Sequence, residues 1–496
     1  MFGQAVNALP QNEVDAPPAP ELRWLRWLFV AFVFSFMFDY KAPDLAFDSE
    51  KTGGSVFQFA FLGLALATSG LTILIGWRYL LVRPGTYLIL FWWGYLAFML
   101  TVAFLSGNEP GRILRLLITP LLLGLGLVTT HIVACAGMRP GEAVRWFLGA
   151  ALGSVIWNLF FGIFGHGSSL SEVRMEILSP AIRFLFAWVG CSLLLRRTFS
   201  WWTLFVLAVP MIPTVLSVTR SLAFPILASA LGAGLCLVLG MMWRLYPASH
   251  PMKKLGPIAI GAGGGLVAVI LVALALPQVT DRWADRLFHN KGGGATTEDL
   301  SALMRKAEAK SMLDILSEEP LSFVYGKGLG ASYYWDESFF PELFQVYPED
   351  RHQFADDIYT AGHSIWTYTL FSSGIIGMAL TIGMFLAVMG FSLWAAWSNA
   401  QTVMGRWAWD AHLLFLPFVA MLCTLSESIT RNPFDERFTG VLFGVMAALP
   451  QFFFNRAFYL RHREQEATLA PQIILQEDEL PDDDWESAFP ERVLIE

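Results

Sequence analysis

Hydrophobic residues in this chain gather in long runs that are separated by short polar breaks. A helix needs roughly 20 apolar residues to cross a bilayer, and twelve of the runs come near that length. The predicted spans cover residues 22–38, 55–76, 86–105, 113–136, 143–164, 181–195, 201–217, 222–243, 256–277, 364–394, 409–428 and 438–458. We therefore expect an all-α integral membrane protein with about twelve transmembrane helices.

Composition supports this class and excludes others. Of 496 residues, 55% are apolar and only 15% are charged, whereas soluble domains carry about 25% charged residues. A soluble enzyme or a nucleic-acid-binding protein is thereby excluded. The formal net charge is −8, but residues 464–496 hold eleven acids and one arginine, so the rest of the chain is close to neutral.

The polar segments divide the chain and orient it. We expect both tails to be cytoplasmic, because with the N-terminus inside, the short inner loops carry sixteen basic residues against nine in the short outer loops, as the positive-inside rule requires. The expected parts are an N-terminal tail (1–21), spans one to nine (22–277), an outer loop (278–362), spans ten to twelve (363–459) and an acidic tail (460–496).

The outer loop is expected to be a structured cap on the membrane domain. At 85 residues it is too long to be a plain connection. Spaced apolar residues between a capping Thr296 and the helix-ending Pro320 predict an amphipathic helix over 298–318. Glycine clusters at 292–294 and 326–330 flank it as turns.

Basic residues concentrate on this outer side and form the candidate binding site. Arginine matches phosphate oxygens with a planar fork that keeps its charge, so such a cluster suits an anionic ligand such as a diphosphate. The candidates are Arg220 between spans seven and eight, Arg174 and Arg183 around the start of span six, Arg305, Lys306 and Lys310 on the cap helix, and His363 before span ten.

Four short motifs follow one another between about residues 215 and 380. They are Thr219-Arg220-Ser221, Arg305 fifteen residues before Pro320, the alternating Gly326, Gly328 and Gly330, and His363-Ser364 followed by Gly374 and Gly377. In this order, the motifs resemble those of the O-antigen ligase and polymerase superfamily, which are bacterial envelope glycosyltransferases. Elsewhere the chain resembles that family in its topology only.

The resemblance implies a chemistry and a location. It implies transfer of a glycan from an undecaprenyl-diphosphate-linked donor to a hydroxyl of a glycan, lipid or protein acceptor. The reaction would invert the anomeric centre on the periplasmic face of a bacterial inner membrane, without a metal or other cofactor and with membrane lipids around it. Arg220 and Arg305 would bind the diphosphate and His363 would be the general base, with Arg174, Arg183, Lys306 and Lys310 as secondary substrate-binding candidates.

Three other functions fit parts of the sequence. A polymerase of O-antigen or exopolysaccharide would join lipid-linked repeat units by the same chemistry. A different class of multi-span glycosyltransferase uses an acid in its first outer loop, where Asp48 and Glu50 stand. A transporter or flippase of lipid-linked glycans is the non-enzymatic alternative, although the predicted spans are largely free of charge at their centres.

Overall fold

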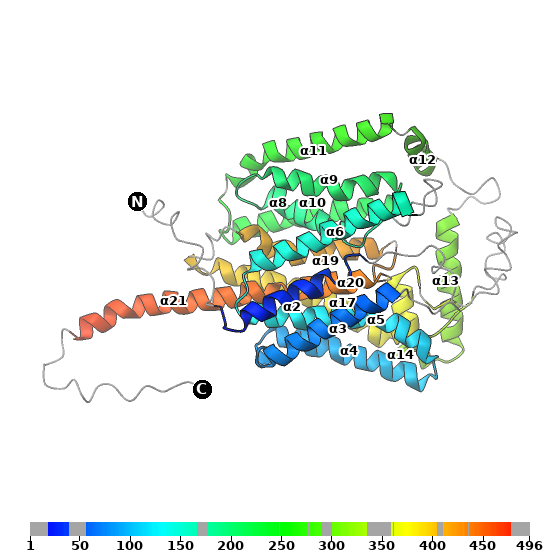
Figure 1. Ribbon diagram of the computed structural model, residues 1–496, viewed down its shortest axis with the longest axis horizontal. Coiled ribbons are helices and arrows are strands. Elements are labelled where there is room, and N and C mark those ends of the chain that lie inside the picture. Colours follow the sequence, from blue (N-terminus) through cyan, green and yellow to red (C-terminus); the bar gives the residue numbers. More distant parts are fainter. Residues whose placement is uncertain are drawn as a thin grey trace.

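The computed structural model describes residues 18–38, 56–165, 177–247, 249–275, 277–288, 300–334, 359–360, 362–403, 410–429, 431–434 and 436–477. Within these ranges the chain is helical and contains no β-strand, and an isolated antiparallel bridge joins Tyr333 to Tyr359. Figure 1 shows that most of the helices run side by side in an elongated bundle.

The first half of the chain supplies nine α-helices and two short 3-10 helices to the described structure. They are α2 (Leu22–Phe34), α3 (Val56–Gly76), η4 (Trp77–Leu81), α4 (Gly85–Leu105), α5 (Pro110–Cys135), α6 (Pro140–Gly165), α8 (Ile182–Leu194), α9 (Trp201–Leu216), η5 (Arg220–Leu222), α10 (Ala223–Met242) and α11 (His250–Ala275).

The second half adds the cap and the remaining helices of the bundle. They are α12 (Pro277–Phe288), α13 (Leu300–Ser317), α14 (Ser322–Tyr325), α17 (Ile365–Ala400), η6 (Ala411–Phe415), α19 (Leu416–Ser428), α20 (Arg437–Ala448) and α21 (Pro450–Glu477).

The helices agree with a membrane protein. Among the described residues, eight helical segments are long and apolar enough to cross a membrane, and α8 and α9 are shorter apolar helices. Each of the twelve predicted spans coincides with helical structure. The total of twelve crossings stays a prediction.

The last predicted span, 438–458, falls within a helical segment, Arg437–Gln465, that is long and apolar enough to cross a membrane. It consists of α20 and the start of α21, which are separated at Leu449. Pro450 explains the break, because proline has no N–H to donate within a helix and is well placed at a helix start. After the break, α21 continues to Glu477, well into the segment 460–496 that the sequence assigns to the acidic tail.

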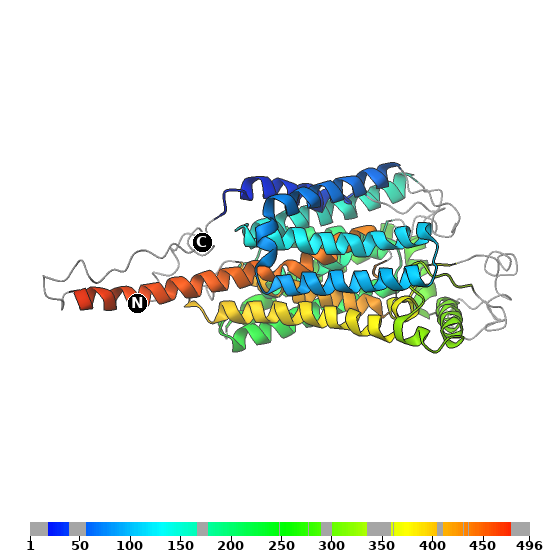
Figure 2. The same cartoon turned by 90° about the horizontal axis from the view of Figure 1, so that it is seen from below.

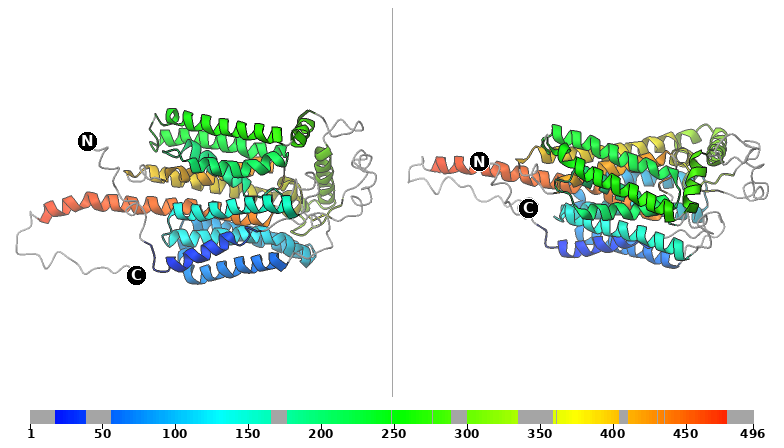
Figure 3. Two further views of the ribbon diagram at one scale, coloured as in Figure 1. Left: turned by 45° about the horizontal axis from the view of Figure 1, so that its top comes forward. Right: turned by 90° about the horizontal axis from the view of Figure 1, so that it is seen from above.

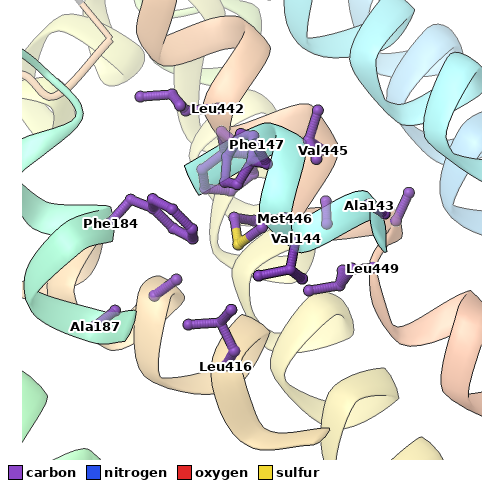
Figure 4. Packing of buried hydrophobic residues seen from close by; sticks show 14 of the residues in the cluster. Ala143, Val144, Phe147, Phe184, Ala187, Leu416, Leu442, Val445, Met446 and Leu449 are labelled. Atoms are coloured by element: carbon purple, nitrogen blue, oxygen red, sulfur yellow. The ribbon is translucent and has the colours of Figure 1, made fainter. Parts of the chain in front are cut away.

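The centre of the bundle is built on close contact between α5 and α20. Gly126 lies against the backbone of Gly444, and Gly440 lies against the carbonyl of Thr119. Small residues at such crossings let two apolar helices approach closely and gain van der Waals contact, which drives helix association in membranes. Figure 4 shows the neighbouring core, where Phe184 of α8 packs with Leu442 and Met446 of α20.

The two ends of the bundle differ. At one end, which we call the cap end, α13 crosses the ends of the other helices, as Figures 1 and 2 show. At the other, which we call the tail end, α21 projects beyond the bundle (Figure 3). The indole of Trp283 in α12 donates to the carbonyl of Val215 at 3.0 Å, which places the end of α9 at the cap end.

The predicted glycine turn at 326–330 joins the cap to the bundle. Gly326, Gly328 and Gly330 all have φ near +80° to +90°, where glycine alone is unstrained. The N–H groups of Lys327 and Gly328 donate to the carbonyls of Phe371 and Ser372 in α17, at 2.8 and 2.9 Å.

A kink in α17 makes room for this turn. Gly374, inside the helix, has φ +66° and ψ −166°. In an unbroken helix the carbonyls of Phe371 and Ser372 would accept from residues 375 and 376, but here the turn supplies the donors. Asn108 fixes the turn from its other side, since its amide donates to the carbonyls of Lys327 and Leu329 at 2.9 and 3.1 Å.

Replacing Gly328 by alanine is expected to destabilise the protein. The new Cβ would overlap the backbone of Ala103, and this overlap lowers the stability of the fold by roughly 1–3 kcal/mol. The positive φ of the residue lowers it by about 1–2 kcal/mol more, because a side chain is strained there. Gly107→Ala is the matched control, because Gly107 has φ +69° but open space around it. Thermal unfolding in detergent measures both, and equal losses would contradict the close packing of the turn.

Candidate functional site

The best-defined polar contact at the cap end joins His363 to Glu308. Nδ1 of His363 lies 2.6 Å from Oε2 of Glu308, and the backbone N–H of His363 donates to Oε1 at 2.7 Å. The Glu308 side chain is 2% exposed, whereas that of His363 is 57% exposed. A buried carboxylate therefore holds an imidazole whose remaining surface faces outward.

The residues around His363 fix its backbone. Ser364 begins α17 with extended backbone, and its hydroxyl accepts from the N–H of Thr367 at 3.5 Å. The amide of Asn432, in the loop between α19 and α20, donates to the carbonyl of Gly362 at 3.3 Å. His363 is thus placed by three segments far apart in the sequence.

Hydrophobic packing positions Glu308. Leu303, Ala307, Met312 and Leu316 form the buried side of α13, and they pack with Tyr333 and Phe371 in a small core under the cap. This agrees with the amphipathic helix predicted over 298–318, within its described part. Glu308 is itself buried and lies four residues before Met312, one helical turn away, so it belongs to the same buried side of the helix.

A second polar cluster lies close by, around Arg183. Its guanidinium donates to Glu427 Oε2 at 2.5 Å, to Thr439 Oγ1 at 2.9 Å and to the carbonyls of Pro180 and Pro433 at 3.0 and 3.2 Å. The sequence places Arg183 at the edge of a span as a secondary substrate-binding candidate. In the structure it lies at the start of α8, as expected, and it is buried among protein partners because α8 is surrounded by other helices.

Arg431 connects this cluster to the loop beside His363. Its guanidinium pairs with Glu427 at 3.2 Å and with Glu436 at 3.0 Å. Asn432, the next residue, makes the contact with Gly362 described above. The Arg183 cluster and the His363–Glu308 pair are therefore neighbours at the cap end.

Two small hollows lie side by side among these groups. Their volumes are about 10 and 20 Å³, so each has room for about one water molecule. The first, which we call the pocket, is lined by Leu178, Ser179, Pro180, Ile182, Arg183, Leu222, Glu427, Arg431 and Glu436. The second, which we call the crevice, shares Pro180 and Arg183 with the pocket and is lined otherwise by Phe184, Ala420, Met421, Thr424, Thr439, Leu442, Phe443 and Met446. Charged side chains therefore lie next to an apolar wall at this place in the bundle.

The other predicted site residues have different settings. Arg220 is exposed in η5, two residues before the pocket-lining Leu222. Arg305, Lys306 and Lys310 are exposed on α13, with Arg305 three residues before Glu308. Arg174, Asp48 and Glu50 lie outside the described residues.

Four acidic or basic residues of this region are absent from the sequence-based candidates, namely Glu308, Glu427, Arg431 and Glu436. Glu308 carries a detectable signal, because it occupies an apolar-stripe position of the predicted cap helix, between Met304 and Met312. Glu427 lies inside a predicted span, where a charge is costly and marks a functional or structural site. Arg431 shows no such pattern.

Comparisons with known proteins leave the family open. No family model matches the chain, and no curated protein matches it. Across the ranges that the structure describes, no group of three or more histidine, cysteine, aspartate and glutamate side chains is arranged to hold a metal ion.

Proposed function

We propose that the protein is a membrane glycosyltransferase similar to O-antigen ligases. In this proposal it transfers a glycan from an undecaprenyl-diphosphate-linked donor to an acceptor hydroxyl on the periplasmic face of a bacterial inner membrane. The observation that supports it most is the outward-facing His363, held by the buried Glu308, near a cluster of charged side chains that borders an apolar wall.

The proposed reaction is a direct displacement. The acceptor oxygen attacks the anomeric carbon, the bond from that carbon to the diphosphate oxygen breaks, and the undecaprenyl diphosphate leaves with the bonding electrons. His363 takes the proton of the acceptor hydroxyl, because a neutral imidazole is a good base near neutral pH. Attack opposite the leaving group inverts the anomeric centre.

Cations stabilise the departing diphosphate in this mechanism. Charge grows on the leaving group as its bond to the sugar breaks, and preorganised donors lower the energy of that state. Arg220 and Arg305 are exposed at the cap end and are the proposed donors. Lys306 and Lys310 extend the same basic face of α13 and are the proposed secondary contacts.

The pocket and crevice support a lipid-linked donor. Arg183, Glu427 and Arg431 give the pocket polar walls, while Phe184, Leu442 and other apolar side chains line the crevice. In the proposal, both hollows widen when the donor binds, so that its polar head lies at the pocket and its first isoprene units lie along the apolar wall of the crevice.

Transfer by the purified protein in lipid vesicles tests the proposal. We supply undecaprenyl-diphosphate-linked glycan with a lipid acceptor, and separately the donor alone, in buffer containing a metal chelator. The expected result is release of undecaprenyl diphosphate together with a new glycosidic bond to the lipid acceptor. Longer lipid-linked chains from the donor alone would show a polymerase instead. Movement of donor across the vesicle membrane without bond formation would overturn the proposal in favour of a transporter.

A further inference from the structure

Glu308 is unusual because it puts a carboxylate on the buried side of the cap helix. Burying a charged group is costly unless hydrogen bonds compensate. Here both carboxylate oxygens of Glu308 contact the same residue, His363. Oε1 accepts from the backbone N–H of His363, and Oε2 faces its ring Nδ1. One carboxylate therefore fixes both the position of the His363 backbone and the rotation of its ring.

This contact also selects the protonation form of the imidazole. An ionised carboxylate can only accept, so Nδ1 must carry the proton that it shares with Oε2. In the neutral ring, Nε2 is then left with a lone pair. The 57% exposure of the side chain shows that the ring is not enclosed by protein.

We propose that Glu308 is the positioning residue for His363, so that the cap helix supplies part of the transfer machinery. This inference rests on the function proposed above. Glu308 keeps Nε2 ready to accept the proton of the acceptor hydroxyl, and its negative charge stabilises the imidazolium that forms as the proton moves. Glu308 itself touches neither substrate.

The charged groups around the pair are consistent with this role. On α13, Arg305 and Lys306 are exposed, and Arg305 lies three residues, about one helical turn, before the buried Glu308. From the α19–α20 loop, Arg431 is engaged by Glu427 and Glu436. On the α17 side, the Cβ of Tyr368 and Oε1 of Glu308 both lie close to Gly362.

Glu308→Gln tests the proposal, because glutamine keeps the shape of the side chain and removes its charge. We expect kcat for glycan transfer to fall on the order of 10²-fold. This is a smaller loss than the factor of about 10⁴ that follows the analogous change behind the histidine of Ser-His-Asp enzymes. The KM for the donor should stay unchanged. The acidic limb of the pH–rate profile should move to lower pH, because an amide stabilises an imidazolium less than a carboxylate does.

Two further variants complete the experiment. Glu318→Gln, at an exposed position directly after the end of α13, is the control and should behave as wild type. Glu308→Asp keeps the charge but shortens the side chain, so it should lower kcat while leaving the acidic limb in place. If Glu308→Gln does not accumulate in the membrane, full activity of Glu308→Asp would overturn the proposal.

The outcomes separate this inference from the proposed function. If His363→Ala transfers glycan as wild type does, the proposed function has lost its base, whatever Glu308 does. If His363→Ala is inactive but Glu308→Gln keeps the wild-type rate and pH profile, only the role of Glu308 is overturned. A slow Glu308→Gln with an unmoved acidic limb would show a merely structural contact and would also overturn it.

Discussion

Replacing His363 by alanine is expected to lower the rate of glycan transfer about 10²- to 10⁴-fold, which is the usual contribution of a general base. His363 is 57% exposed, but its ring compensates the buried carboxylate of Glu308, so the rate is expressed per amount of folded protein in the membrane. The initial rate of undecaprenyl diphosphate release in vesicles measures the loss. His462→Ala, an exposed histidine in α21 towards the tail end, is the control and should keep the full rate.

The pH–rate profile of the His363→Ala protein is a second measurement that tests the same prediction. Without the imidazole, the remaining rate should lose the acidic limb that the base gives the wild-type profile, because no group then has to release a proton near neutral pH. A His363→Ala protein that folds normally and transfers glycan at the wild-type rate would contradict the assignment of the base.

The coarse fold could be predicted from the sequence because hydropathy reports directly on helices that face lipid. Each predicted span contains helical structure. Pro450 interrupts the hydrogen bonds inside the last predicted span, but the apolar pattern runs across it, and α20 and the start of α21 form one segment that is apolar enough to cross a membrane. Hydropathy measures how apolar a segment is, and it does not report a missing hydrogen bond.

The kink of α17 shows what sequence patterns miss. Gly374 was part of a motif, yet nothing in the local pattern indicates a non-helical residue there. The kink depends on donors from the turn at 326–330, about 45 residues earlier in the chain. Such a feature results from tertiary hydrogen bonding and so cannot be inferred from the helix's own residues.

The sequence predicted which residue types belong to the candidate site, but it did not predict which side chains they contact. His363 and the cap helix follow from spacing and amphipathic pattern, but their connection through Glu308 requires two segments 55 residues apart to meet. The opposite case is Arg183, which was expected at a membrane edge and is buried against Glu427. A sequence shows a charge near the end of a span, but it does not show which helices surround that span.

The ion pair of Arg183 and Glu427 leads to the second prediction with a large effect. Their side chains are 6% and 4% exposed, and Nη1 of Arg183 lies 2.5 Å from Oε2 of Glu427. Removing one partner of a buried pair leaves the other charge uncompensated and costs about 3–5 kcal/mol. Glu427→Gln should therefore lower the free energy of unfolding by that amount, measured by denaturant or thermal unfolding in detergent.

A double variant separates charge compensation from packing in this region. Arg183→Met with Glu427→Leu removes both charges and keeps apolar volume, and such replacements are often neutral or stabilising. We expect it to recover most of the stability lost in Glu427→Gln, and the coupling follows from a double-mutant cycle with the single variants. Glu319→Gln is the control, because Glu319 forms an exposed pair with Lys327 and exposed pairs contribute little. If Glu427→Gln were no more destabilising than Glu319→Gln, the pair would not hold α8 against α19, and the polar wall of the pocket would have to be stabilised by other contacts.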